Sequence, residues 1–156
     1  MRIWLVALLL GACTLQPPGG RDPEVPIGAT TRFEPARFAG TWVVRQGLAG
    51  QPVPGALQVS EVDPAGFTWR ENGRDVPARI TGTGRFTLGA GPGSRREVWV
   101  LWIDDGFRTA ALGNPDGSLG LILDRQPAGG EDRIAAARAI MEFNGYDPAK
   151  LVDVTE

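Results

Sequence analysis

The stretch Phe38-Ala39-Gly40-Thr41-Trp42-Val43-Val44 is the first β-prone run after a long lead-in that is rich in proline and glycine. Its glycine lies where the chain would have to turn sharply into a strand. A Gly-x-Trp triplet alone is more often a strand start with a tryptophan in the core than a functional motif. The meaning of the stretch therefore depends on the rest of the chain.

The composition favours one folded β domain. A chain of 156 residues has room for a hydrophobic core, and 42% apolar residues argue against disorder of the body. The 22 glycines and 13 prolines favour short strands joined by turns. The net charge is −2 and no basic stripe is present, so the sequence gives no reason to expect nucleic acid as a partner.

The residue types needed for most catalytic chemistry are scarce. The sequence has no histidine, which excludes Ser/His/Asp and Cys/His triads and histidine-ligated zinc. Its single cysteine, Cys13, cannot form an intrachain disulfide. The paired acids Asp104-Asp105 are the one tempting constellation, and a solvated turn explains them better. We therefore expect no enzyme activity, no cofactor and no metal site.

Residues 1–12 carry one cation followed by an apolar run, which is shorter than the roughly 20 residues of a spanning helix and is typical of a signal peptide. The segment Leu10-Gly11-Ala12-Cys13 resembles the lipobox of bacterial lipoproteins. That resemblance implies a Cys13 that carries a diacylglyceryl group and acyl chains such as palmitate. The alternative is an ordinary signal peptide with a chance cysteine.

The lipobox resemblance also implies a location. Thr14, rather than aspartate, follows the cysteine, and in lipoproteins of this kind that favours the outer membrane, here on its periplasmic face. Residues 13–31 lack periodicity and are expected to form a flexible tether. The predicted organisation is therefore a signal peptide over 1–12, a tether over 13–31 and a folded domain over 32–156.

Short β-prone runs separated by turn signals follow the tether. The expected strands span residues 40–48, 56–62, 67–71, 76–81, 85–88, 96–104, 107–112 and 119–125. The sixth run is apolar at every position from Val98 to Ile103, so both of its faces must be covered. Eight strands are enough to close a barrel whose interior is filled with side chains or holds one small ligand.

A helical pattern follows Gly130. Ile134, Ala137 and Met141 recur at helical spacing, and Gly145 is well placed to end the helix. The natural partner of this helix is the outside of the doubly apolar strands. The expected fold is mainly β: an eight-stranded antiparallel up-and-down barrel with one C-terminal α-helix packed outside.

The order of these features resembles the lipocalin family, and more specifically the bacterial outer-membrane lipocalins. The resemblance rests on Phe38 to Trp42, on Asp104 to Asp116, on Ile122 to Pro127, and on the carboxy-terminal Gly145-Tyr146-Asp147 with Lys150-Leu151-Val152. It implies that Trp42 plugs the closed end of the barrel and that Arg125 packs across the tryptophan ring. Such a pair is expected to combine a cation–π contact with hydrogen bonds to the backbone.

Side-chain alternation predicts which residues face a ligand. Counting from Arg125 places Leu123, Leu121 and Leu119 on the inner face, and counting from Trp42 adds Val44. In the sixth strand either Trp99 or Trp102 is expected to line the interior, and Trp102 is chosen.

The resulting hypothesis is a membrane-anchored carrier for a small hydrophobic ligand such as a fatty acid or lysophospholipid in the cell envelope. Its case rests on the apolar lining expected for the barrel and on a membrane anchor that lies close to a supply of lipid. The alternative is a filled barrel that acts as a periplasmic protease inhibitor or an envelope interaction protein.

Overall fold

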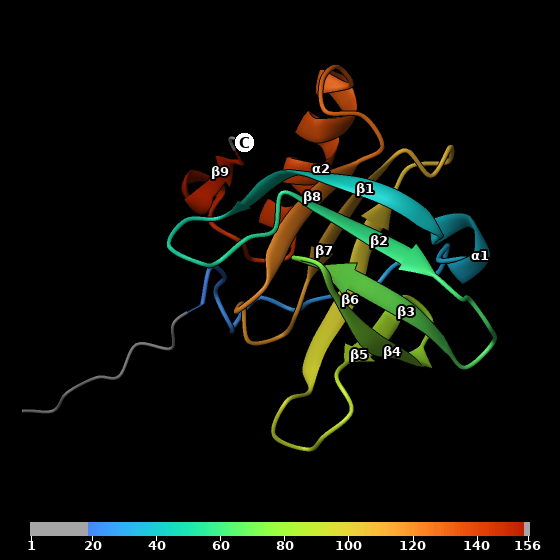
Figure 1. Ribbon diagram of the computed structural model, residues 1–156. Helices are drawn as coiled ribbons and strands as arrows, with labels where there is room; N and C mark the ends of the chain where they lie inside the picture. Colours follow the sequence, from blue (N-terminus) through green and yellow to red (C-terminus); the bar gives the residue numbers. More distant parts are fainter. Residues whose placement is uncertain (1–18, 155–156) are drawn as a thin grey trace, which may run out of the picture.

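The computed structural model describes residues 19–154, and its centre is a closed antiparallel β-barrel (Figure 1). The barrel strands are β1 (Gly40–Leu48), β2 (Ala56–Ser60), β3 (Gly66–Glu71), β4 (Arg74–Gly82), β5 (Arg85–Leu88), β6 (Arg96–Ile103), β7 (Thr109–Gly113) and β8 (Gly120–Asp124). Each strand pairs with the next, and β1 pairs with both β2 and β8 to close the ring. The predicted eight-stranded barrel is confirmed.

One long helix, α2 (Glu131–Phe143), packs on the outside of the barrel as predicted. Ile134, Ala137 and Met141 are buried on its inner face and cluster with Leu101, Ala111 and Ile122 of β6, β7 and β8. Burial by the helix explains why these strands are apolar on both faces. No helix within the described residues is long and apolar enough to cross a membrane.

Three short elements were not expected from the sequence. Helix α1 (Pro35–Phe38) precedes β1, and a 3₁₀ turn, η1 (Pro148–Lys150), leads into β9 (Leu151–Asp153). Strand β9 pairs with residues 46–48 of β1, past Val43, where the pairing between β1 and β2 stops. These elements depend on contacts made by the finished barrel, so a local pattern does not reveal them.

The two ends of the barrel differ. Helix α1 and the loops 61–65, 83–84 and 104–108 lie at the end where β1 begins, which we call the closed end. The loops 49–55, 72–73, 89–95 and 114–119 lie at the opposite end, which we call the open end. The open end is therefore formed mainly by loops rich in glycine and proline.

Residues 19–31 differ from the expected tether, because they lie against the barrel. We call this segment the amino-terminal strap. Its Gly20 N–H donates to the Gly117 carbonyl at 2.8 Å, and its Thr30 N–H donates to the Val100 carbonyl at 2.7 Å. Figure 1 shows the strap in blue, running from the 49–55 and 114–119 loops behind the barrel toward α1. The predicted signal peptide and Cys13 lie outside the described residues.

Candidate functional site: the open end of the barrel

The closed end is built around Trp42, whose side chain is fully buried. Its indole N–H donates to the Phe38 carbonyl of α1 at 2.8 Å, and its ring centre lies 5.0 Å from that of Phe38. The Arg125 guanidinium carbon lies 3.6 Å from the centre of the Trp42 ring. The structure therefore brings together the two residues that the sequence paired.

Arg125 also ties three backbone segments together. Its Nε donates to the Phe107 carbonyl at 3.2 Å, and its two terminal nitrogens donate to the Thr41 and Arg37 carbonyls at 3.0 Å each. Gly40 has a φ of +102°, and a Cβ there would lie 3.1 Å from Arg125 Nη1. The glycine is thus needed both for its backbone conformation and for the approach of the arginine. Burial lowers the pKa of the Arg125 guanidinium.

Four of the five predicted ligand-facing residues lie on the inner side of the barrel. Val44, Leu121 and Leu123 are buried in the interior cluster, and Leu119 is half-buried against it at the open end. Ile122 points outward to the helix cluster, as alternation requires.

The prediction for Trp102 is wrong: both Trp99 and Trp102 lie outside the barrel, packed against the cluster of α2. The cause is an irregularity in β6. Val100 pairs with Leu112 and Trp102 pairs with Ala111, so Leu101 is an extra residue in the strand. One extra residue reverses the side-chain alternation beyond it. Two tryptophans three positions apart therefore share the outer face.

The inside of the barrel is filled with side chains. Every residue of the interior cluster is 9% exposed or less. Phe86 stands at its centre, 4.9 Å from Phe67, 5.9 Å from Trp69 and 6.2 Å from Phe33 between ring centres. Large rings thus fill the space that a deep ligand would need.

A pocket of about 220 Å³ that has more apolar than polar side chains in its lining lies at the open end. It is bounded by the 49–55 and 114–119 loops and by the strand ends beside them. Its lining comprises Leu48, Gln51, Pro52, Val53, Arg96, Ser118, Leu119, Gly120 and Leu121. Its volume is below the roughly 300–1,000 Å³ of a pocket for a drug-sized molecule, so it suits one part of an acyl chain.

A second, more polar pocket of about 360 Å³ adjoins the first. Both pockets are lined by Arg96 and Ser118, and the second adds Arg95, Glu97, Asn114, Pro115 and Asp116. The open end therefore places an apolar compartment beside a polar one that contains two arginines and two acids, Glu97 and Asp116.

Arg96 is positioned by a contact at the top of the interior. Its Nη2 donates to Glu71 Oε1 at 2.7 Å, while Glu71 Oε2 accepts from the Trp69 indole N–H at 2.9 Å. The Arg96 side chain is still 40% exposed. A guanidinium has five N–H donors, so the bond to Glu71 leaves donors that can meet a ligand anion.

The sequence did not single out Arg96 or Val53 as site residues. The available signal for Arg96 was an arginine pair directly after the glycine-rich break at 89–94. Val53 lies in an uncharged loop, 49–55, and its half-buried position against the interior follows only from the closure of the barrel.

The acidic pair Asp104-Asp105 lies in the turn between β6 and β7, at the closed end. Asp104 is buried, and its carboxylate accepts from the backbone N–H groups of Arg108 at 2.6 Å and Thr109 at 2.7 Å. Burial alone would raise the pKa of Asp104, but these hydrogen bonds and the Arg108 guanidinium lower it on balance. The pair lies in a turn, as the sequence interpretation held, but only Asp105 is solvated, because Asp104 is buried.

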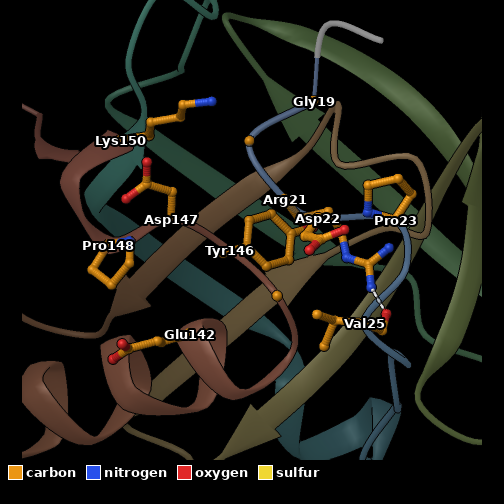
Figure 2. A pocket seen from close by; sticks show the side chains of 12 residues that line it. Gly19, Arg21, Asp22, Pro23, Val25, Glu142, Tyr146, Asp147, Pro148 and Lys150 are labelled. Carbon is orange, nitrogen blue, oxygen red and sulfur yellow. Dashed lines mark hydrogen bonds between the residues drawn. The ribbon is translucent and has the colours of Figure 1, made fainter. Parts of the chain in front are cut away.

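A third hollow, of about 630 Å³, lies outside the barrel between the strap, the end of α2 and η1 (Figure 2). Buried Arg21 fixes the strap here, since its guanidinium donates to the carbonyls of Asn144, Pro115 and Val25. Figure 2 shows Arg21 and Asp22 next to Tyr146. The contacts of Arg21 are with backbone oxygens, so this region holds the strap in place.

Comparisons with known proteins agree with this architecture. Residues 86–156 match the family described as the lipocalin-like domain. Lobster apocrustacyanin A1 superposes with a TM-score of 0.62 at 15% identity, over 78% of this chain and 78% of that chain. The fold is that of a lipocalin. Insecticyanin from the tobacco hornworm Manduca sexta has this fold too, with a TM-score of 0.61 at 14% identity over 84% of this chain and 85% of its own.

No curated protein matches the sequence closely enough to supply a function. Within the described part of this barrel, the two pockets that share Arg96 and Ser118 lie at the open end, whereas the interior is filled with side chains.

Proposed function

We propose that this protein is a lipid-anchored carrier that binds an amphiphile, such as a fatty acid or a lysophospholipid, at the open end of its barrel. The observation that carries the proposal is the apolar pocket that shares Arg96 and Ser118 with a polar pocket. Part of an acyl chain would lie against Val53, Leu119 and Leu121. Apolar surface buried there contributes roughly 25 cal/mol per Å² to binding.

The polar end of the amphiphile would lie beside the arginines. A carboxylate or phosphate oxygen can accept from the N–H groups of Arg96 that Glu71 does not use, with Arg95 nearby. The acids of the polar pocket already accept hydrogen bonds, Glu97 from the Trp99 indole N–H at 2.6 Å and Asp116 from the Ser118 hydroxyl at 2.7 Å. The arginines are therefore the groups that would meet an anionic head, with the apolar tail in the neighbouring pocket. The proposal assigns the chain no enzymatic role.

The proposed anchor is Cys13, with a location at the periplasmic face of the outer membrane. Support comes from the lipobox-like segment Leu10-Gly11-Ala12-Cys13, the preceding apolar run and Thr14. Two or more acyl chains suffice for stable attachment at about 0.8 kcal/mol per buried CH₂. Cys13→Ser should release the protein into the soluble fraction, whereas continued sedimentation with the outer membrane would contradict the anchor.

The ligand test is a native mass spectrometry titration of the chain from residue 14 onward with palmitate and with a lysophospholipid. We expect a one-to-one complex. Arg96→Gln removes charge-assisted hydrogen bonds of roughly 1.5–3 kcal/mol and should weaken palmitate binding by at least about tenfold. Arg79→Gln is the matched control, because Arg79 is an exposed arginine of β4 outside both open-end pockets.

Leu119→Asp tests the apolar compartment in the same titration. A charge on this half-buried side chain would face the acyl chain, so binding should be lost while the fold is kept. If neither lipid binds the unmodified chain, the carrier proposal fails.

The filled interior favours a second candidate function. A barrel packed with Trp69, Phe67 and Phe86 resembles a rigid scaffold, on which the loops would contact another envelope protein or a protease. The absence of lipid binding by a correctly folded chain would favour this scaffold.

A further inference from the structure

The strap begins at the open end of the barrel. Gly19 lies against the 114–119 loop, since a Cβ at Gly19 would be 2.7 Å from the Asp116 carbonyl oxygen. The next residue, Gly20, donates its N–H to the Gly117 carbonyl at 2.8 Å. The described chain therefore starts beside the ligand pockets and not at the plugged end.

Several contacts hold the start of the strap in this place. The Asp22 N–H donates to the Gly145 carbonyl at 2.7 Å, and the Asp147 N–H donates to the Gly20 carbonyl at 3.0 Å. Arg21 adds a side-chain bond to the Asn144 carbonyl at 3.0 Å. The strap is thus bound to the barrel and to the segment after α2, which fixes the point where the preceding residues attach.

The open end also has an apolar, weakly charged surface. Among the described residues, Phe143 at 80% and Val152 at 44% are the large apolar side chains that are most exposed. Phe143 ends α2 beside the strap, and Val152 pairs with Gly47 near the end of β1. The 49–55 loop carries no charge, the 89–95 loop carries only Arg95, and the 114–119 loop carries only Asp116.

The closed end has the opposite character. Its loops carry the exposed acids Glu61, Asp63 and Asp105 and the exposed cation Arg108, while Asp105 pairs with Arg32 and Glu34 pairs with Arg37 beside α1. Charged side chains and ion pairs lose solvation when they are pressed against lipid, whereas exposed apolar side chains are attracted to a membrane surface. The weakly charged, apolar surface therefore lies at the same end of the barrel as the start of the strap.

We propose that the open end of the barrel faces the membrane surface, with Phe143, Val152 and the 49–55 loop in contact with lipid. This orientation rests on the anchor proposed above. Residues 13–18 span at most about 20 Å when fully extended, so the acylated cysteine holds Gly19 within that distance of the bilayer. Strand β1 has nine residues. At about 3.3 Å per residue the strand spans about 26 Å, and a tilt of roughly 35–45° places the closed end about 20 Å farther along the barrel axis.

The orientation has a direct consequence for the proposed ligand. An amphiphile that leaves the bilayer would meet the apolar and polar pockets without crossing bulk water. The orientation also explains why a short strap begins beside the pockets while the opposite end is plugged by Trp42 and α1.

A pair of labelled variants tests the orientation in the full, lipidated chain. Ala49→Cys and Ala65→Cys place a fluorophore in exposed loops at the open and closed ends, respectively. The acylated Cys13 thiol is blocked and takes no label. Each protein is reconstituted into vesicles of phosphatidylethanolamine and phosphatidylglycerol that contain a phospholipid quencher. We expect loss of most of the emission at position 49 and little loss at 65.

Equal quenching at both positions, or stronger quenching at 65, would overturn the orientation. Phe143→Asp should lower the quenching at position 49, whereas Phe143→Leu, its apolar control, should preserve it. Equal quenching with aspartate and leucine at position 143 would remove Phe143 from the contact surface and so contradict the proposal as stated.

A second way of attaching the chain to vesicles tests the orientation independently of the acylation of Cys13. A chain with a hexahistidine tag in place of residues 1–13 is bound to vesicles that contain a nickel-chelating lipid, and the same labels are read. If Cys13 is not acylated, the full chain fails to reconstitute but the tagged chain still reports the orientation. Lipid titration of the tagged chain tests ligand binding independently of both.

Discussion

The Arg125 guanidinium lies 3.6 Å above the centre of the Trp42 ring, and its three donor nitrogens bind carbonyls from three separate backbone segments. The arginine thus joins the last barrel strand to the first and to the turn between β6 and β7. The closed end is held by one planar side chain, and each of its three nitrogens donates to a backbone carbonyl.

Replacement of this arginine should destabilise the barrel. In Arg125→Lys the ammonium cannot reach three carbonyls at once, and the cation–π contact weakens. We expect a loss of about 2–4 kcal/mol in the free energy of unfolding, measured by urea denaturation. Arg79→Lys, at an exposed position, should stay within about 0.5 kcal/mol of the unmodified chain. A loss from Arg125→Lys no larger than that of the control would show that the fork geometry contributes little.

The outward position of Trp102 makes a different prediction for ligand binding. Because Trp102 packs against the α2 cluster and not against the interior, Trp102→Phe should leave palmitate affinity unchanged. Loss of part of the buried ring area should lower the unfolding free energy by about 1–2 kcal/mol. Isothermal titration and urea denaturation measure the two effects on one sample. A tenfold weaker affinity for palmitate would contradict the outward assignment.

Much of the fold could be predicted because its signals are local. Strand β1 was predicted with its exact bounds, since a glycine with positive φ and a turn-rich loop bracket it. Alternation placed Val44, Leu121 and Leu123 on the inner face without any knowledge of their neighbours. The period change after Gly130 revealed α2, because its buried residues repeat at helical spacing.

The parts that could not be predicted depend on contacts between distant segments. The extra residue at Leu101 leaves no mark in an uninterrupted apolar run, so the inner face of β6 could not be assigned. Residues 19–31 lack periodicity, and their position depends on Arg21 reaching carbonyls of Pro115 and Asn144, about a hundred residues away. Likewise, the pocket at the open end exists only where the 49–55 and 114–119 loops meet.

A buried ion pair should control the attachment of α2. Asp124 is fully buried, and its Oδ2 accepts from the Thr109 hydroxyl and from Arg133 Nη2 at 3.2 Å. Arg133→Met leaves that carboxylate without its cation and should cost about 3–5 kcal/mol in urea denaturation. The double variant Arg133→Met with Asp124→Asn removes the uncompensated charge and should recover part of the loss. A double variant less stable than Arg133→Met would contradict this account.

Alkaline pH should destabilise the protein through Tyr146, its only tyrosine. Burial raises the pKa of Tyr146 to about 12, while its hydroxyl donates to the Leu119 carbonyl at 2.6 Å. In the unfolded chain the Tyr146 hydroxyl ionises near pH 10. The stabilisation that the buried neutral phenol provides is therefore complete below that pH and is lost as the pH rises to about 12. The loss should reach about 2–3 kcal/mol, with tyrosinate absorbance appearing only above pH ~11 in the folded chain.

Tyr146→Phe provides the control for this titration. The variant should be less stable by about 1–3 kcal/mol at neutral pH, because the Asn114 N–H that donates to the hydroxyl at 2.9 Å and the Leu119 carbonyl lose their partner. Its stability should then fall less steeply between pH 10 and 12, since no phenol remains to ionise. An equally steep fall in both proteins would assign the alkaline transition to other groups, and tyrosinate absorbance at pH ~10 in the folded chain would show that Tyr146 is accessible to solvent.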